Sequence, residues 1–156
     1  MKTIILFAGK YGTTREIAER IAKKTDGATV YNLKRDSIPD LEEFDCVIIG
    51  SSIYVGMIRK EAKAFLSENK DILSRKKTGL FLSGLEASGE KEFFEKNFSP
   101  DLLRSAKATA FLGGIFDPQK NSLMERFITK VVAKQSGYIN TIDDSKIEGF
   151  VKDLKS

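Results

Sequence analysis

Short apolar runs alternate along this chain with amphipathic segments. Five runs, continuous or alternating in polarity, predict strands at residues 2–7, 28–33, 45–50, 78–83 and 108–115. Apolar positions at helical spacing predict helices at residues 13–24, 59–73, 90–97, 121–134 and 143–154. Strands that alternate with helices indicate βαβ units with right-handed crossovers. We therefore predict an α/β fold, a doubly wound five-stranded parallel sheet in the order 2-1-3-4-5 with helices on both faces.

The composition predicts one domain, residues 1–156, and excludes several kinds of chemistry. With 156 residues, 41% of them hydrophobic, the chain can bury a core without disulfides or metals. It has no histidine and one cysteine, which excludes catalytic Ser-His or Cys-His groups, histidine metal ligands and an internal disulfide. The net charge of +4 comes from interspersed charges of both signs, so no nucleic-acid partner is expected. No apolar run reaches the length of a membrane span or a signal-peptide core, and we expect a cytoplasmic protein.

The first candidate site is the loop at residues 8–15, directly after the first strand. Its two glycines let backbone amides approach an anion, the following helix start adds unpaired N–H groups, and Lys10 adds a cation. Thr13 and Glu16 have the spacing of a capping box. The spacing is wrong for a Walker A loop and for G-x-G-x-x-G. The loop therefore predicts a phosphate site, and the alternative is an ordinary turn before a capped helix.

Two further loops follow strands that neighbour the first one in the predicted sheet. In residues 50–56, Tyr54 can stack on a planar ring while Ser51 and Ser52 bond to the ring's edge. The alternative is that Tyr54 only covers the core. Residues 83–89 are small and polar, so their amides can reach the other rim of such a ring. A phosphate loop beside an aromatic side chain predicts a mononucleotide site.

These segments resemble a known family. Residues 4–18 resemble the phosphate loop of flavodoxins, and residues 45–56 resemble their first isoalloxazine loop. The resemblance is closer to one branch, the flavodoxin-like menaquinone-dependent protoporphyrinogen dehydrogenases, which the segments at 14–18 and 111–137 also match. Flavodoxins usually open the phosphate loop with Ser or Thr, where this chain has Gly9, and we expect Lys10 to compensate.

The resemblance implies FMN as the cofactor, with its ring against Tyr54. It implies that this aromatic face lowers the reduction potential of the flavin. No residue of the chain is needed as a catalytic group, because the flavin carries the electrons. The expected cofactor-binding residues are Gly9, Lys10, Tyr11, Gly12, Thr13, Thr14, Ser51, Ser52, Ile53, Tyr54, Val55, Gly56, Ser83, Gly84 and Leu85.

Two functions follow from the resemblance. One is an FMN-dependent oxidoreductase that passes electrons to a quinone, which would place the protein in haem biosynthesis. The other is a small electron carrier of flavodoxin type. Such carriers are as a rule strongly acidic, whereas this chain has an isoelectric point near 9.1, which favours the first function. The amphipathic segment at 121–134 has Arg126 and Lys130 opposite its apolar face. A face of this kind ordinarily packs on the sheet. The alternative is that the basic side makes peripheral contact with anionic lipid at the inner face of the membrane. A cofactor-free receiver module is disfavoured, because Gly50 and Ser51 stand where it needs a phospho-acceptor aspartate.

Overall fold

The computed structural model describes residues 1–85, 88–118 and 138–156. Along the chain it contains β1 (Thr3–Ala8), α1 (Thr13–Lys23), β2 (Thr29–Asn32), η1 (Leu41–Glu43), β3 (Cys46–Tyr54), β4 (Met57–Ile58), α2 (Lys60–Glu68), α3 (Lys70–Arg75), β5 (Lys77–Ser83), α4 (Glu90–Asn97), α5 (Pro100–Ser105), β6 (Ala108–Phe111), β7 (Ile115–Phe116), β8 (Ile139–Asn140) and α7 (Asp144–Lys155). The helix predicted at 121–134 lies outside the described residues.

The main sheet confirms the predicted topology. Its strands run in the order β2-β1-β3-β5-β6, and all four pairings along this path are parallel. These are the five predicted strands in the order 2-1-3-4-5. Near its end, β1 places Phe7 beside Asn32 of β2 on one side and Gly50 of β3 on the other. The strand ends are therefore aligned, and the loops that follow them lie at one edge of the sheet.

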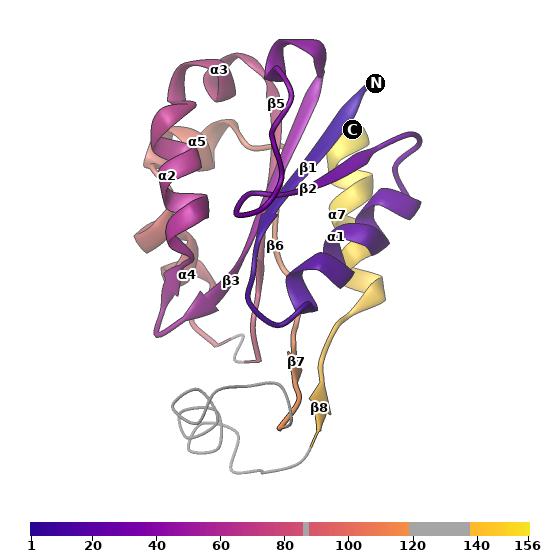
Figure 1. Cartoon of the computed structure of the whole chain (residues 1–156), viewed down its shortest axis with the longest axis vertical. Helices are drawn as coiled ribbons and strands as arrows, with labels where there is room; N and C mark the ends of the chain where they lie inside the picture. Colours follow the sequence, from indigo (N-terminus) through magenta and orange to yellow (C-terminus); the bar gives the residue numbers. More distant parts are fainter. Residues whose placement is uncertain (86–87, 119–137) are drawn as a thin grey trace.

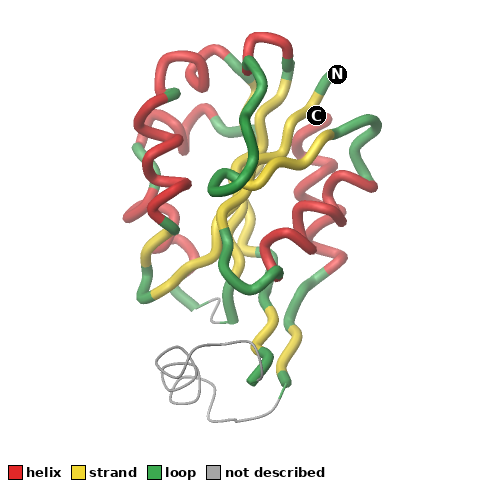
Figure 2. Tube along the Cα trace, in the orientation of Figure 1, coloured by secondary structure: helices red, strands yellow, loops and turns green. Residues whose placement is uncertain are grey.

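Helices cover both faces of this sheet, as predicted. Figures 1 and 2 show α1 and α7 on one side and α2 to α5 on the other. Alternate residues of β1 supply the two cores: Ile4 and Leu6 join the cluster under α2 to α5, and Ile5 and Phe7 join the cluster under α1 and α7. All four are at most 3% exposed. Both faces of the strand are thus buried, which explains its continuous apolar sequence.

The predicted helix at 59–73 is two helices. The chain breaks between α2 and α3 at Asn69, whose backbone leaves the helical region at φ −115°, ψ 23°. Its side-chain amide donates to the carbonyl of Phe65 at 2.9 Å, a local bond that competes with continuation of the helix. Within the described residues, no helix has both the length and the apolar character that a membrane span requires.

The predicted strand at 108–115 is also interrupted. β6 ends at Phe111, and Gly113 adopts φ +93°, a left-handed conformation that ends the strand. The chain then continues as β7, which pairs antiparallel with β8. Figure 1 shows this two-stranded pair extending beyond the sheet at the edge where the site loops lie.

Candidate functional site

The loop between β1 and α1 has the backbone geometry of an anion site. Gly12 is the N-cap of α1 at φ +91°, and the first bond of the helix runs from the amide of Glu16 to the carbonyl of Gly12 at 3.0 Å. The amides that precede Glu16 at the start of α1 have no carbonyl one turn earlier to bond, so they can serve an anion. The predicted capping box is wrong: no side chain caps this helix, because Thr13 already lies inside its first turn.

Thr14 turns inward and explains an unusual residue in this loop. Its hydroxyl lies 2.9 Å from the hydroxyl of Ser83 at the end of β5, and both side chains are 1% exposed. A Cβ placed on Gly9 would lie only 2.6 Å from the Thr14 Oγ1. Gly9 is therefore required by the packing of Thr14, and a serine or threonine at position 9 would not fit without a shift of this helix.

The second predicted loop is a β-hairpin. β3 continues through Tyr54 and pairs with β4 across a tight turn at Val55 and Gly56, both at positive φ (51° and 74°). This turn matches the right-handed twist of the two strands. Asn97 of α4 holds the hairpin, since its side chain donates to the carbonyl of Gly56 at 2.9 Å and accepts from the amide of Ile58 at 3.0 Å. Tyr54 is thus presented by an anchored strand end.

Arg59, which the sequence did not single out, donates hydrogen bonds to the two serines that precede Tyr54 in β3. Its Nε donates to the hydroxyl of Ser52 at 2.7 Å, and its backbone amide donates to the hydroxyl of Ser51 at 2.9 Å. Its guanidinium carbon lies 5.4 Å from the centroid of the Tyr54 ring. The two serines predicted to bond a ligand therefore hold Arg59, and a cation lies against the predicted aromatic platform.

The third loop lies against the second. A Cβ on Gly84 would lie 3.9 Å from the Cβ of Ile53, and the Gly84 amide donates to the carbonyl of Gly113 at 2.9 Å. Leu85 follows as the last described residue before the gap, which contains Glu86. Together with the bond between Thr14 and Ser83, these contacts bring all three predicted loops to one place.

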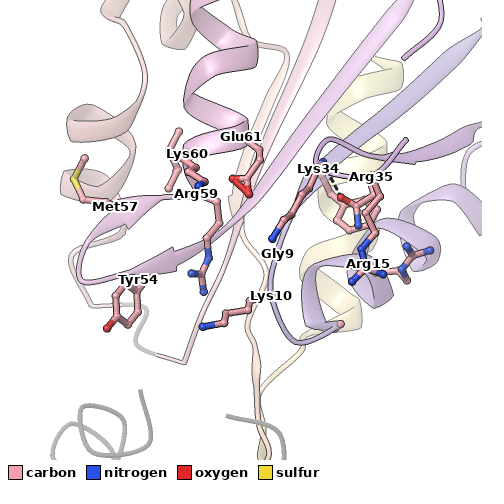
Figure 3. A pocket seen from close by; sticks show the side chains of 14 residues that line it. Gly9, Lys10, Arg15, Lys34, Arg35, Tyr54, Met57, Arg59, Lys60 and Glu61 are labelled. Atoms are coloured by element: carbon pink, nitrogen blue, oxygen red, sulfur yellow. Dashed lines mark hydrogen bonds between the residues drawn. The ribbon is translucent and has the colours of Figure 1, made fainter. Parts of the chain in front are cut away.

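A cleft opens beside these loops, with a volume of about 510 Å³. Gly9, Lys10, Gly12 and Tyr54 of the predicted site line it, and so do Asn32 and residues 34–35 after β2 and 57–61 around the hairpin. Figure 3 shows Lys10 and Arg59 reaching into it from opposite elements, with Lys34 and Glu61 above them. Among the described residues, its lining carries six basic side chains and one acidic one, Glu61; the basic ones are Lys10, Arg15, Lys34, Arg35, Arg59 and Lys60. Of these, Arg15 pairs with Glu19 of α1 at 4.0 Å. Basic side chains therefore predominate in the described lining.

One buried polar atom in this cleft is unsatisfied. The Oε2 of Glu61 is shielded from solvent and has no hydrogen-bond partner among the described residues. A buried acceptor without a donor costs about 1–3 kcal/mol. Because solvent does not reach this oxygen, a ligand in the cleft can donate to it only after the Glu61 side chain moves.

The single cysteine of the chain is Cys46, in β3. It lies in the middle of the core with its side chain fully buried. This burial raises the pKa of its thiol from 9.0 to about 11. At neutral pH the thiol is protonated and is not a nucleophile.

The residues present fit the phosphate and ring of a flavin mononucleotide. The start of α1, the glycine loop and Lys10, whose ammonium lies 5.3 Å from the Tyr11 ring, suit a dianion. Tyr54 offers an aromatic side chain, and Gly84, directly after β5, lies beside Ile53, the residue that precedes Tyr54. The donor set is that of a phosphate and a planar ring.

Comparison with known proteins points to the same cofactor class. Residues 4–142 match the family model described as "Flavodoxin domain". The chain is 26% identical over 147 residues to the Escherichia coli (strain K12) protein named Protoporphyrinogen IX dehydrogenase (quinone), covering 88% of this chain and 81% of that protein.

Solved structures share the fold. A short-chain flavodoxin associated with a PDU bacterial microcompartment aligns over 99% of this chain and 97% of its own, with a TM-score of 0.59 and 14% identity. A flavoprotein from Lactobacillus acidophilus NCFM in complex with FMN aligns over 70% of this chain and 92% of its own, with a TM-score of 0.51 and 17% identity. At these identities the likeness shows that the fold is shared, and no more than the fold.

Proposed function

Because the chain belongs to the flavodoxin-domain family and is an FMN-binding protein, we propose that it is an FMN-dependent oxidoreductase that passes electrons to a quinone, of the protoporphyrinogen dehydrogenase type. The name of the E. coli relative supports this choice of substrate and acceptor. The proposal places the protein in the cytoplasm. The alternative contact of residues 121–134 with the inner face of the membrane stays a prediction, because these residues lie outside the described part of the chain.

We assign the FMN phosphate to the loop from Gly9 to Thr14. The glycines let the backbone approach the phosphate, the start of α1 provides amide donors, and Lys10 neutralises part of the charge. The ring is assigned to the space between Tyr54 and the backbone at Ser83, Gly84 and Leu85. Tyr11, Thr13, Ser51, Ser52, Ile53, Val55 and Gly56 complete the predicted shell.

FMN, when bound, accepts and donates one or two electrons or a hydride. The chain's own contribution is to bind and orient it. The anchored hairpin fixes Tyr54, and the Thr14–Ser83 bond ties the phosphate loop to the third loop. Arg59 places a positive charge beside the aromatic face, which favours the more negative, reduced form of the cofactor.

The observation that carries the choice of acceptor is the positive cleft. Among the residues that the structure describes, six basic side chains and one acidic one line it next to the assigned FMN site. A surface of this sign repels a basic redox protein and leaves a neutral quinone unaffected. An electron carrier that docks on basic partners requires the opposite sign at this place.

Stopped-flow oxidation of the photoreduced holoprotein tests this proposal. We expect menadione to oxidise it faster than cytochrome c at low ionic strength, and added salt to speed the cytochrome reaction by screening the repulsion. A cytochrome rate that exceeds the menadione rate and falls with salt would replace the proposal with the electron-carrier function.

A further inference from the structure

We propose that the side chains of Val55 and Lys96, at the tip of the β3–β4 hairpin, bind the reduced substrate, with Val55 against its apolar ring and Lys96 at a carboxylate on the ring's edge. The proposal rests on the proposed porphyrinogen function, because protoporphyrinogen is a largely apolar ring that carries carboxylate side chains. It does not depend on which acceptor takes the electrons. Three features of the described residues support it: the backbone conformation of Val55, the exposure of its side chain, and the position of the Lys96 ammonium.

Val55 holds a backbone conformation that its side chain disfavours. Its φ is +51°, and among the described residues it is the one residue other than glycine with a positive φ. A hairpin turn of this kind favours Asn-Gly or Asp-Gly, because asparagine and aspartate tolerate the left-handed region. A β-branched side chain at positive φ is an outlier, and such strain commonly marks a functional position. The chain therefore has a valine where an asparagine would fold more easily.

Packing within the chain does not compensate for this strain. Val55 is 66% exposed, the largest value among the large hydrophobic residues that the structure describes. It directly follows Tyr54, which we assign to the flavin ring, and Asn97 of α4 anchors the turn by its bonds to Gly56 and Ile58. The backbone of this turn can contact FMN while the exposed side chain contacts a substrate. An apolar ligand that reaches the flavin would thus remove the Val55 side chain from water.

Lys96 places a cation at the same hairpin tip. Its Nζ lies 3.5 Å from the position that a Cβ on Gly56 would occupy, and Figure 1 shows α4 beside the hairpin. On this helix Lys91 pairs with Glu95 at the (i, i+4) spacing, at 3.8 Å. Glu92 stands at the same spacing before Lys96, in the more favourable order, yet among the described residues the Lys96 ammonium has no carboxylate partner. The cation is therefore available at the tip for a carboxylate of a ligand.

The two side chains together narrow the class of ligand. A neutral quinone would use only Val55, and a small anion would use only Lys96. An apolar ring with a carboxylate at its edge uses both. Protoporphyrinogen has this chemistry, so the hairpin tip takes the electron donor rather than the acceptor.

The test is fluorescence titration of the FMN-saturated protein with deuteroporphyrin IX, a porphyrin dicarboxylate, and with its dimethyl ester, both in dilute non-ionic detergent. The two probes share the apolar ring, and only the first carries carboxylates. We expect both to bind the wild-type protein. The dicarboxylate should bind more tightly at low salt, and the difference should shrink as salt is added.

Val55→Asn separates substrate contact from a structural role, because its two expected effects have opposite signs. Asparagine tolerates positive φ, so the urea midpoint of the ligand-free protein should rise by roughly 0.3–1 M. Loss of the apolar contact should weaken both porphyrins about 5- to 30-fold. The conservative variant Val55→Ile keeps a β-branched apolar side chain and should bind both porphyrins within about twofold of wild type.

Lys96→Gln tests the carboxylate contact. It should weaken the dicarboxylate roughly two- to fivefold at low salt and leave the affinity for the ester unchanged. The control Lys152→Gln removes the same charge from an exposed position of α7, on the other face of the sheet. This control should change neither affinity.

The outcomes distinguish this inference from the proposed function. Unchanged porphyrin affinity in Val55→Asn, or equal dicarboxylate affinity in Lys96→Gln and Lys152→Gln, would overturn the inference and leave the porphyrinogen function standing. Weaker FMN binding in Val55→Asn, with unchanged porphyrin affinity once FMN is saturating, would place the Val55 side chain in the flavin site instead. If the wild-type FMN-saturated protein binds neither porphyrin, the porphyrinogen function fails, and the inference fails with it.

Discussion

Replacing Thr14 by valine removes one hydroxyl at nearly constant shape, and the structure gives two separate consequences. The hydroxyl bonds Ser83 at 2.9 Å with both side chains 1% exposed, so the variant leaves a buried serine hydroxyl without its partner. Such a group costs about 1–3 kcal/mol of unfolding free energy. In the FMN complex, the phosphate can only accept hydrogen bonds. We therefore expect the Thr14 hydroxyl to donate to the phosphate and to accept from Ser83.

Loss of a hydrogen bond to a charged group costs about 1.5–3 kcal/mol, or roughly 10- to 150-fold in FMN affinity. Titration calorimetry of the apoprotein should show this loss in Thr14→Val for FMN and little change for riboflavin, which has no phosphate. Ser83→Ala should weaken FMN less, because Thr14 keeps its donor.

A double-mutant cycle on urea unfolding without FMN should return a coupling of about 0.5–3 kcal/mol between the two hydroxyls. Equal losses for FMN and riboflavin in Thr14→Val, or a loss in Ser83→Ala as large as in Thr14→Val, would refute the phosphate contact. The pair would then only hold the two loops together.

Three further predictions concern the backbone, the thiol and the flavin potential. A Cβ at Gly113 would overlap a backbone carbonyl oxygen, whereas one at Gly12, with nearly the same positive φ, meets nothing within 4 Å. In urea unfolding, Gly113→Ala should therefore lower the free energy of unfolding by at least ~1–3 kcal/mol more than Gly12→Ala does, and equal losses would contradict this. Burial raises the pKa of Cys46 to about 11, so native protein should resist thiol labelling at pH 8, and rapid labelling would show that the site is open. The stability that the protonated thiol contributes is full below about pH 9 and should be lost as the pH rises toward 11. Arg59→Met removes the cation beside Tyr54 and should lower the FMN reduction potential by roughly 20–70 mV, the effect of a unit charge over about 10 Å at dielectric constants of 80 to 20. Spectroelectrochemistry measures this potential, and an unchanged or higher value would refute the role of Arg59.

The strands and their order could be predicted from the sequence, because a strand buried on both faces has a distinctive continuous apolar run. The run predicted at 45–50 is of this kind, and its residues 46–50 begin the central strand, β3. The same rule failed where the strand continues: Ser51 and Ser52 are polar and resemble a loop, yet they extend β3 and bond Arg59. Contacts with a residue several positions later cannot be deduced from local polarity.

The phosphate loop and Tyr54 could be found because glycines and an aromatic residue follow predicted strands directly. The basic lining of the cleft could not, because exposed lysine and arginine residues look alike wherever they occur. Lys34 and Arg35 still had one signal, their place directly after the second strand, since the ends of parallel strands share one edge of the sheet. Asn69 had none, because its bond to Phe65 depends on the conformation of its side chain.

We propose that FMN in this chain connects a reduced substrate to a quinone. Anaerobic incubation of the FMN-saturated protein with protoporphyrinogen and menadione, followed by the fluorescence of the porphyrin formed, tests this reaction. We expect porphyrin to form only when protein, FMN and menadione are present together. At limiting FMN, the Thr14→Val variant should form less porphyrin, because it binds FMN more weakly. No porphyrin formation by a protein that holds FMN, and whose reduced form menadione readily oxidises, would contradict it.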